Sequence, residues 1–138
     1  MKKTLCFIFL TLSLLNAKEF NTPMKTYMET LSAEAKAANP NFTGFDASRG
    51  KAIFESVHVG KKGKEISCTT CHSNNLKNGG QNINTNKPIT ALAPSVNPVR
   101  LSDVAEVEKW LRRNFNDVFA REGSAFEKGD VLTYIINQ

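Results

Sequence analysis

The feature that most constrains this chain is the pentapeptide Cys68-Thr69-Thr70-Cys71-His72. Two thiols separated by two residues can each form a thioether with a vinyl group of one haem. The histidine that follows can then ligate the iron from the adjacent face. The segment therefore predicts one haem c attached through Cys68 and Cys71, with His72 as an axial ligand. We expect the other ring nitrogen of His72 to donate to a loop carbonyl.

The N-terminus has the pattern of a secretory signal peptide. Two lysines follow the initiator methionine, an apolar run extends from Leu5 to Leu15, and the small residue Ala17 provides a cleavage point. This run is well short of the ~20 residues that span a bilayer. We predict a cleaved signal peptide at 1–17, a single mature domain at 18–138 and export to the periplasm.

Cysteine content and charge limit what the mature part can be. Cys6 leaves with the signal peptide, so only the two motif cysteines remain and no disulfide framework is available. Removing Lys2 and Lys3 lowers the formal charge from +5 to +3. The densest basic cluster, Lys-Lys-Gly-Lys at 61–64, has no interleaved aromatic residues. It indicates a solvated loop or a docking patch for an acidic redox partner, and we expect no nucleic-acid partner.

Two other sites use cysteines at this spacing. A thioredoxin-like redox pair needs a βαβ context, and no strand-rich stretch surrounds Cys68 and Cys71. A zinc site could add His58 and His72, but Cys71 and His72 are adjacent and poorly placed to chelate one ion together. The histidine directly after the second cysteine, the export signal and the lack of other cysteines favour haem c.

The rest of the chain predicts helices joined by long loops. Thr22 is the expected hydroxyl cap of a first helix with Pro23 at its first position, and Asn39-Pro40 ends the apolar repeat of that helix. Asp46 is the expected cap of a second helix over 47–56. Gly50 within that helix costs about 1 kcal/mol against alanine, which indicates close approach of another helix backbone.

The C-terminal third predicts two more helices. Ser102 is the expected cap of one, and Ser124 with Glu127 forms a capping box that opens the other. The predicted apolar face of the first consists of Val104, Val107, Trp110, Leu111, Val118 and Phe119. Prolines and glycines between Ser73 and Arg100 exclude a helix there, so this long loop is expected to wrap the haem edge. The prediction is an all-α domain of four to five helices with long loops around one covalent haem.

The second axial ligand is less evident. Electron-carrier cytochromes of this size take it from a methionine downstream of the motif, but no methionine follows Met28. Met24 and Met28 share a helical face that is typical of core packing. His58 is most simply a solvent-exposed histidine. A lysine amine would first have to lose its proton.

Asn114 is a further candidate. It projects from the apolar face of the third helix, at helical spacing from Leu111 and Val118. A buried amide without a partner costs about 1–3 kcal/mol, so the side chain must bind something. Periodicity alone favours a cap or a hydrogen-bonded core amide over an iron ligand.

Several stretches besides the motif resemble one family. They are Gly80-Gln81, Leu92-Ala-Pro-Ser95 and, above all, Val107-Glu-Lys-Trp-Leu111 followed by Arg113-Asn114. Together they resemble the sphaeroides haem protein family, class I c-type cytochromes first grouped as a domain of unknown function. The similarity covers nearly all of the mature chain and implies a class I cytochrome c-like fold.

The resemblance also assigns a role to Asn114. In that family an asparagine is the sixth ligand of the oxidised iron, and it is released on reduction so that diatomic molecules can bind. The matching position here is Asn114. The well-known form has a disulfide between positions that match Phe115 and Gly123, and this chain has cysteine at neither.

Two classes of function follow from these expectations. The first is a periplasmic monohaem electron carrier, monomeric, with a multihaem or membrane-bound cytochrome as partner. The second is a haem protein that binds oxygen, nitric oxide or carbon monoxide, or performs redox catalysis. Enzymatic activity is the less favoured, because a fast peroxidase needs a distal acid–base histidine and His58 is the sole candidate.

Overall fold

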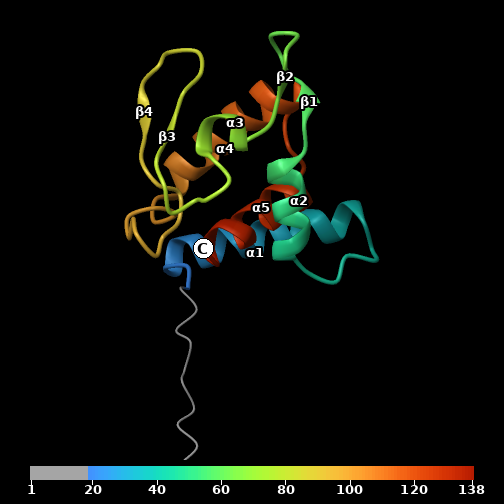
Figure 1. The fold of residues 1–138 in the computed structure, drawn as a ribbon. Coiled ribbons are helices and arrows are strands. Elements are labelled where there is room, and N and C mark those ends of the chain that lie inside the picture. Colours follow the sequence, from blue (N-terminus) through green and yellow to red (C-terminus); the bar gives the residue numbers. More distant parts are fainter. Residues whose placement is uncertain (1–18) are drawn as a thin grey trace, which may run out of the picture.

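The structure, a computed structural model, describes residues 19–138, and the predicted signal peptide at 1–17 lies outside this part. The described chain folds into five helices and two small antiparallel hairpins (Figure 1). The helices are α1 (Thr22–Ala38), α2 (Ala47–Glu55), α3 (Thr69–His72), α4 (Val104–Phe119) and α5 (Ala125–Ile136). The hairpins pair β1 (His58–Val59) with β2 (Glu65–Ile66), and β3 (Gly80–Gln81) with β4 (Pro88–Ile89). The predicted all-α architecture with long loops is confirmed.

The apolar core centres on α5, which packs against both α1 and α2. Its side chains are buried along most of its length, together with Met24 and Leu31 of α1 and Phe54 of α2. Within residues 19–138, no helix combines the length and apolar character that a membrane span requires.

The predicted close approach at Gly50 is confirmed. A Cβ atom at this position would lie 2.0 Å from the carbonyl oxygen of Asp130 in α5, so only glycine allows α2 and α5 to meet here. Asp130 itself is completely buried. Its carboxylate accepts hydrogen bonds from Arg49 Nε at 2.8 Å and from the backbone N–H of Asp46 at 2.7 Å, so its charge is paired.

Two of the predicted helix caps are wrong by one residue. The side chain of Asn21, not Thr22, caps α1, and that of Asp103, not Ser102, caps α4. The hydroxyl of Ser102 instead donates a hydrogen bond to the carbonyl of Val99 at 2.6 Å. The predicted cap at Asp46 and the capping box that opens α5 are confirmed.

The long segment between α3 and α4 is held together by its own contacts. Ala93 N–H donates to the carbonyl of Leu76 at 2.9 Å, and both residues are buried. Arg100 Nε and Asn97 Nδ2 both donate to the carbonyl of Ala91, at 3.1 and 2.9 Å. The β3–β4 hairpin within this segment was not predicted. Its two-residue strands are too short to leave a periodic pattern.

Candidate functional site

The cysteine–histidine motif forms one tight turn. The backbone N–H groups of Cys71 and His72 both donate to the carbonyl of Cys68, at 3.2 and 3.1 Å. The hydroxyl of Thr70 accepts a hydrogen bond from the N–H of Ser67 at 3.0 Å and so closes the start of the turn. Both thiols are free and partly buried, and burial raises the pKa of Cys68 to about 12. The turn therefore brings two thiols and one imidazole together.

Strand β3 supports this turn directly. A Cβ atom at Gly80 would lie 1.8 Å from the carbonyl oxygen of Cys71 and 3.0 Å from Cα of His72. Such contacts are far inside van der Waals distance, so only glycine lets the strand pass here. The main chain of β3 thus fixes the position of the backbone that carries His72.

His72 has the properties of a metal ligand. Its Nδ1 is the one buried side-chain nitrogen or oxygen in residues 19–138 without a hydrogen-bond partner. The predicted bond to a loop carbonyl is therefore not formed. Burial, and then the positive charge of Arg100, lower the pKa of His72 to about 4, so the ring is neutral near pH 7. A neutral imidazole beside two free thiols fits a covalent haem.

Asn114 lies on α4, beside the buried stripe of that helix. The stripe consists of Val107, Leu111, Phe115 and Val118. Asn114 is half-buried, and its side chain makes no hydrogen bond with any group in the described part of the chain. It stands in the middle of the helix, so it is not a cap, and it is not a hydrogen-bonded core amide. The amide remains available to a ligand or a metal.

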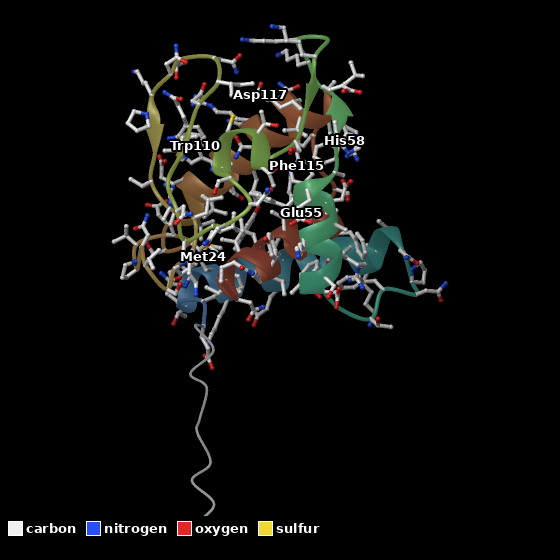
Figure 2. All side chains as sticks on the ribbon, in the orientation of Figure 1. Met24, Glu55, His58, Trp110, Phe115 and Asp117 are labelled. Atoms are coloured by element: carbon white, nitrogen blue, oxygen red, sulfur yellow. The ribbon has the colours of Figure 1, made fainter. Side chains whose placement is uncertain are left out.

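The apolar face predicted for α4 is partly wrong. Trp110 is 43% exposed, and its Nε1–H donates to Glu106 at 3.0 Å, while Phe115 occupies the core in its place. Successive helical residues are about 100° apart, so Trp110 faces well away from Leu111. Figure 2 shows Trp110 and Phe115 at separate positions along α4. Trp110 and Asn114, four residues apart, share the side next to the buried stripe.

Contacts from distant segments hold the part of α4 that follows Asn114. The ring of Phe115 packs against Gly123, where a Cβ atom would lie 2.7 Å from the ring. The carbonyl of Asp117 accepts the N–H of Lys61 at 3.0 Å, and Gly60 leaves room for this approach. The two positions that match the family's disulfide therefore touch without a covalent bond. Sequence reasoning missed both contacts, because neither glycine lies in a recognisable pattern.

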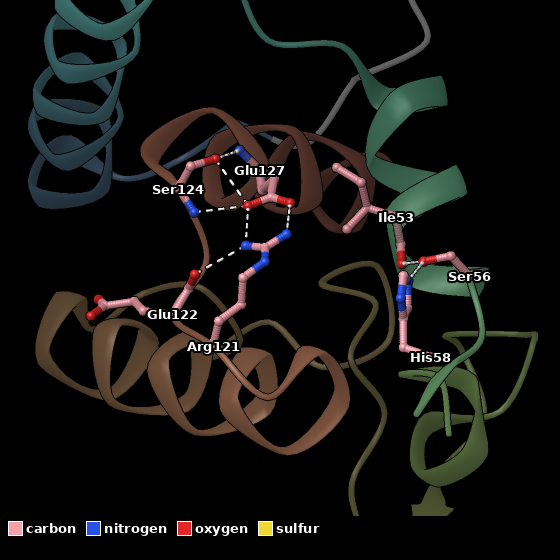
Figure 3. A network of polar contacts seen from close by, with 7 residues as sticks. All are labelled: Ile53, Ser56, His58, Arg121, Glu122, Ser124 and Glu127. Atoms are coloured by element: carbon pink, nitrogen blue, oxygen red, sulfur yellow. Dashed lines mark hydrogen bonds and ion pairs between the residues drawn. The ribbon is translucent and has the colours of Figure 1, made fainter. Parts of the chain in front are cut away.

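Polar contacts fix the connection between α4 and α5 (Figure 3). Arg121 binds Glu127 with two hydrogen bonds, at 2.6 and 2.9 Å. The same carboxylate accepts the N–H of Ser124 at 2.8 Å. The Arg121 guanidinium lowers the pKa of Glu127 to about 2. This network keeps Gly123, and hence the packing against Phe115, in place.

The other ligand candidates are engaged elsewhere. His58 is half-buried, not solvent-exposed as predicted: its Nε2 lies 2.8 Å from Ser56 Oγ (Figure 3), and its ring centroid lies 4.2 Å from that of Phe119. Met24 is completely buried in the core, and Met28 packs against the same cluster, as predicted. No group of three or more His, Cys, Asp or Glu residues within 19–138 could hold a metal ion. The alternative zinc site is not formed.

One hollow of the described surface lies away from the motif. It occupies about 520 Å³ between α1, α4 and the start of α5, and Tyr27, Glu34, Glu108 and Glu122 contribute to its lining. Burial, and then these carboxylates, raise the pKa of Tyr27 to about 12. None of the predicted site residues lines this hollow.

Comparison with protein families identifies relatives along most of the chain. A family model described as a domain of unknown function (DUF1924) matches residues 40–135. The cytochrome c-type protein SHP of Cereibacter sphaeroides is 46% identical over 93 residues, which cover 67% of this chain and 71% of that protein. Cytochrome c″ of Methylophilus methylotrophus is 36% identical over 104 residues, 75% of this chain and 72% of that protein.

Solved structures agree with these relatives. Oxidised SHP, described as an oxygen-binding cytochrome c, superposes with a TM-score of 0.72 at 39% identity, covering 83% of this chain and 96% of that one. The solution structure of M. methylotrophus cytochrome c″, described in connection with haem-ligand detachment, gives 0.74 at 32% identity, covering 85% and 94%. The chain is similar to both over nearly the whole of its described part.

Proposed function

Because this chain belongs to the DUF1924 family and is similar to the cytochrome c-type protein SHP and to cytochrome c″, we propose that it transfers single electrons and opens a ligand position on reduction. These relatives make it a monohaem c-type cytochrome with one covalently attached haem c. When bound, the haem supplies a one-electron couple and an iron with two axial positions. Residues of this chain determine which groups would bind the iron in those positions.

Cys68 and Cys71 are proposed to hold the haem as thioethers, with His72 as the permanent axial ligand. The support is local: one turn brings the three side chains together, and the imidazole is neutral with an unpaired buried nitrogen. β3 packs against this backbone at Gly80, so His72 cannot move without displacing a strand. This half of the site is suited to a ligand that stays bound in both oxidation states.

Asn114 is proposed as the second axial ligand of the oxidised protein, and this residue carries the proposal. It is half-buried on α4 and lacks a hydrogen-bond partner among residues 19–138, in a chain without a methionine after Met28. An amide oxygen is a weak, hard donor that suits ferric iron better than the softer ferrous ion. Asn114 would therefore leave on reduction. Cytochrome c″, whose structure is described in terms of haem-ligand detachment, makes such a release plausible in this fold.

The physiological role that we propose is electron transfer in the periplasm. The predicted signal peptide at 1–17 supports export, and the mature domain at 18–138 is proposed to act as a monomer. The proposed partner is another cytochrome, multihaem or membrane-bound, that exchanges one electron with the haem.

Binding of a diatomic gas is the second candidate function. The observation that favours it is the relative SHP, which is described as an oxygen-binding cytochrome c. Release of Asn114 would free the position that oxygen, nitric oxide or carbon monoxide needs. A peroxidase is not favoured, because His58 is hydrogen-bonded to Ser56 and packs against Phe119.

Substitution of Asn114 tests the ligand assignment. We expect Asn114→Leu to change the ferric absorption spectrum, whereas Asn116→Leu, a half-buried asparagine on the same helix, leaves it unchanged. The reduced wild-type protein should be high-spin and bind carbon monoxide quickly. Low-spin spectra in both oxidation states without carbon monoxide uptake would exclude Asn114 release. An unchanged ferric spectrum in Asn114→Leu would assign the ligand to another residue.

Mass spectrometry tests the attachment independently. Exported from a host competent in cytochrome c maturation, the wild-type chain should carry one haem, and Cys68→Ala/Cys71→Ala none. Covalent haem in the double variant would show that the motif is not the attachment site.

A further inference from the structure

Charge is distributed unevenly between two parts of the described chain. The segment from residue 56 to 102, which contains the haem motif and both hairpins, has six basic residues and one acidic residue, a net charge of +5. The remaining described residues, 19–55 and 103–138, have nine basic and twelve acidic residues, a net charge of −3. The weakly basic balance of the whole chain hides a strong electrostatic asymmetry.

The positive charge of the motif segment is not neutralised internally. None of its lysines, nor Arg100, forms an ion pair within residues 19–138. The ion pairs of the structure lie in the other part and involve Lys25, Arg49, Lys51, Lys109, Arg121 and Lys128. Unpaired surface cations project their field into solvent and attract anionic partners at low to moderate salt.

The two hairpins bring these lysines to one end of the molecule. Lys61, Lys62 and Lys64 lie in the β1–β2 connection and Lys87 in the β3–β4 connection, all exposed. Lys62 Nζ donates to Asn84 Oδ1 at 2.7 Å, which joins the two hairpins. Figure 1 shows α3 between them. β2 leads directly into the motif turn and β3 packs against it at Gly80, so this face is continuous with the haem attachment.

Each hairpin also exposes one apolar side chain. Val59 next to the lysine run is 67% exposed, and Ile83 at the other hairpin is 49% exposed. We define the hairpin face as Val59, Lys61, Lys62, Lys64, Ile83 and Lys87. Apolar groups among charged residues are typical of protein interfaces in which charge guides the encounter. Redox complexes of this kind are small and transient.

We propose that the hairpin face is the docking surface for an acidic electron-transfer protein. The inference rests on the proposed electron-transfer function and adds the surface and the chemistry of the partner. Lysines steer an acidic protein toward the end of the molecule that carries the motif, and Val59 and Ile83 provide the central contact. The remaining described residues, with their net negative charge, disfavour docking of an acidic protein on the surfaces that they form.

Small redox reagents of opposite charge test the local field on the holoprotein. Ferricyanide, an anion, and tris(phenanthroline)cobalt(III), a cation, each take one electron from the reduced protein in a stopped-flow experiment. We expect the ferricyanide rate to fall and the cobalt rate to rise as salt increases. Opposite trends, or no salt dependence, would overturn the proposal without requiring any variant.

A pair of charge-reversal variants locates the effect. Lys61→Glu/Lys62→Glu/Lys64→Glu changes the hairpin face. Lys25→Glu/Lys36→Glu/Lys51→Glu makes the same change of net charge on α1 and α2, which lie outside that face (Figure 1). At low salt the first should slow oxidation by ferricyanide roughly tenfold, and the second by much less. Equal effects would show that only net charge matters.

An acidic protein donor tests docking itself. Reduced flavodoxin should transfer an electron to the ferric wild-type protein at a rate that falls with salt, and the hairpin variant should lose most of this rate. Retention of the rate in that variant would overturn the docking surface. Failure of the electron-transfer function is seen separately, as absence of a reversible one-electron wave in voltammetry of the wild-type protein.

Discussion

The regions around His72 and Asn114 are constructed differently. His72 belongs to a four-residue helix whose hydrogen bonds join residues at most four positions apart, and strand β3 packs against its backbone. Asn114 belongs to a 16-residue helix whose C-terminal half is held by the Phe115–Gly123 packing and by one main-chain hydrogen bond from Lys61. Close main-chain contacts restrain the first region on two sides, whereas the second depends on side-chain packing and a single main-chain bond.

This difference suits the two proposed roles. A permanent ligand needs a backbone that cannot shift, and Gly80 against Cys71 provides one. A ligand that is released on reduction needs a support that permits small movements. The contact of Phe115 with Gly123 is packing alone, where a disulfide would restrain the distance covalently. The comparison predicts that substitutions near His72 lower the stability of the whole domain. Substitutions near Asn114 should mainly change the binding of the distal ligand.

The largest effect is expected for Gly80→Ala. Its new Cβ atom would lie 1.8 Å from the carbonyl oxygen of Cys71, so strand or motif must move, and we expect a loss of about 3 kcal/mol or more. Denaturant unfolding of the holoprotein measures this loss. Gly63→Asn is the control, because Gly63 has φ of 71°, which asparagine tolerates, and nothing within 4 Å of its Cβ position. Equal stability of the two variants would show that β3 does not restrain the motif.

A smaller and more selective effect is expected for Gly123→Ala. The added methyl group would lie 2.7 Å from the Phe115 ring and press on the helix turn that carries Asn114. We expect a loss of about 1–3 kcal/mol, with an altered ferric spectrum and unchanged haem content.

Ala120→Gly is the control for that variant. Ala120 ends α4 with φ of 54°, a conformation that glycine adopts at less cost, so the change alters the same connection without touching Phe115. Its stability should rise slightly and its ferric spectrum should stay as in the wild type. If Gly123→Ala also left the ferric spectrum unchanged, the backbone that carries Asn114 would be as rigid as the backbone that carries His72.

The smallest effect is expected for Glu127→Gln, which removes the charge that Arg121 binds but keeps an acceptor for the capping box. We expect a loss of about 1 kcal/mol at neutral pH. The folded pKa of about 2 lies below the ordinary 4.5, so this contribution is complete above pH 4.5 and is lost as the pH falls toward 2. Thermal unfolding across that range should show the variant and wild type converging. A difference that persists below pH 2 would contradict this origin.

Glu122→Gln is the matched control, because Glu122 is an exposed partner of Lys128 and lies outside the capping box. We expect no measurable change of stability in this variant.

Features that depend on a few neighbouring residues could be predicted from the sequence. Gly50 was identified as a close-approach site because glycine is unfavourable inside a helix, and the Ser124–Glu127 box has a fixed spacing. The caps of α1 and α4 were misplaced because two neighbouring residues could each serve. Which of them reaches the helix N–H depends on the path of the preceding backbone.

The environment of Asn114 could not be predicted in the same way. Helical periodicity places it beside the core, but the predicted apolar face included Trp110, whereas the structure buries Phe115. The contacts of Phe115 with Gly123 and of Asp117 with the loop at Gly60 had no recognisable pattern in the sequence.

The cofactor and its mode of attachment are encoded by five consecutive residues, Cys68 to His72, because thioether formation and ligation depend on spacing within one turn. The availability of Asn114 and the joining of two lysine-bearing hairpins into one face depend on contacts between segments far apart in the chain. Such contacts form only when the fold buries its core, so they become visible only in the tertiary structure.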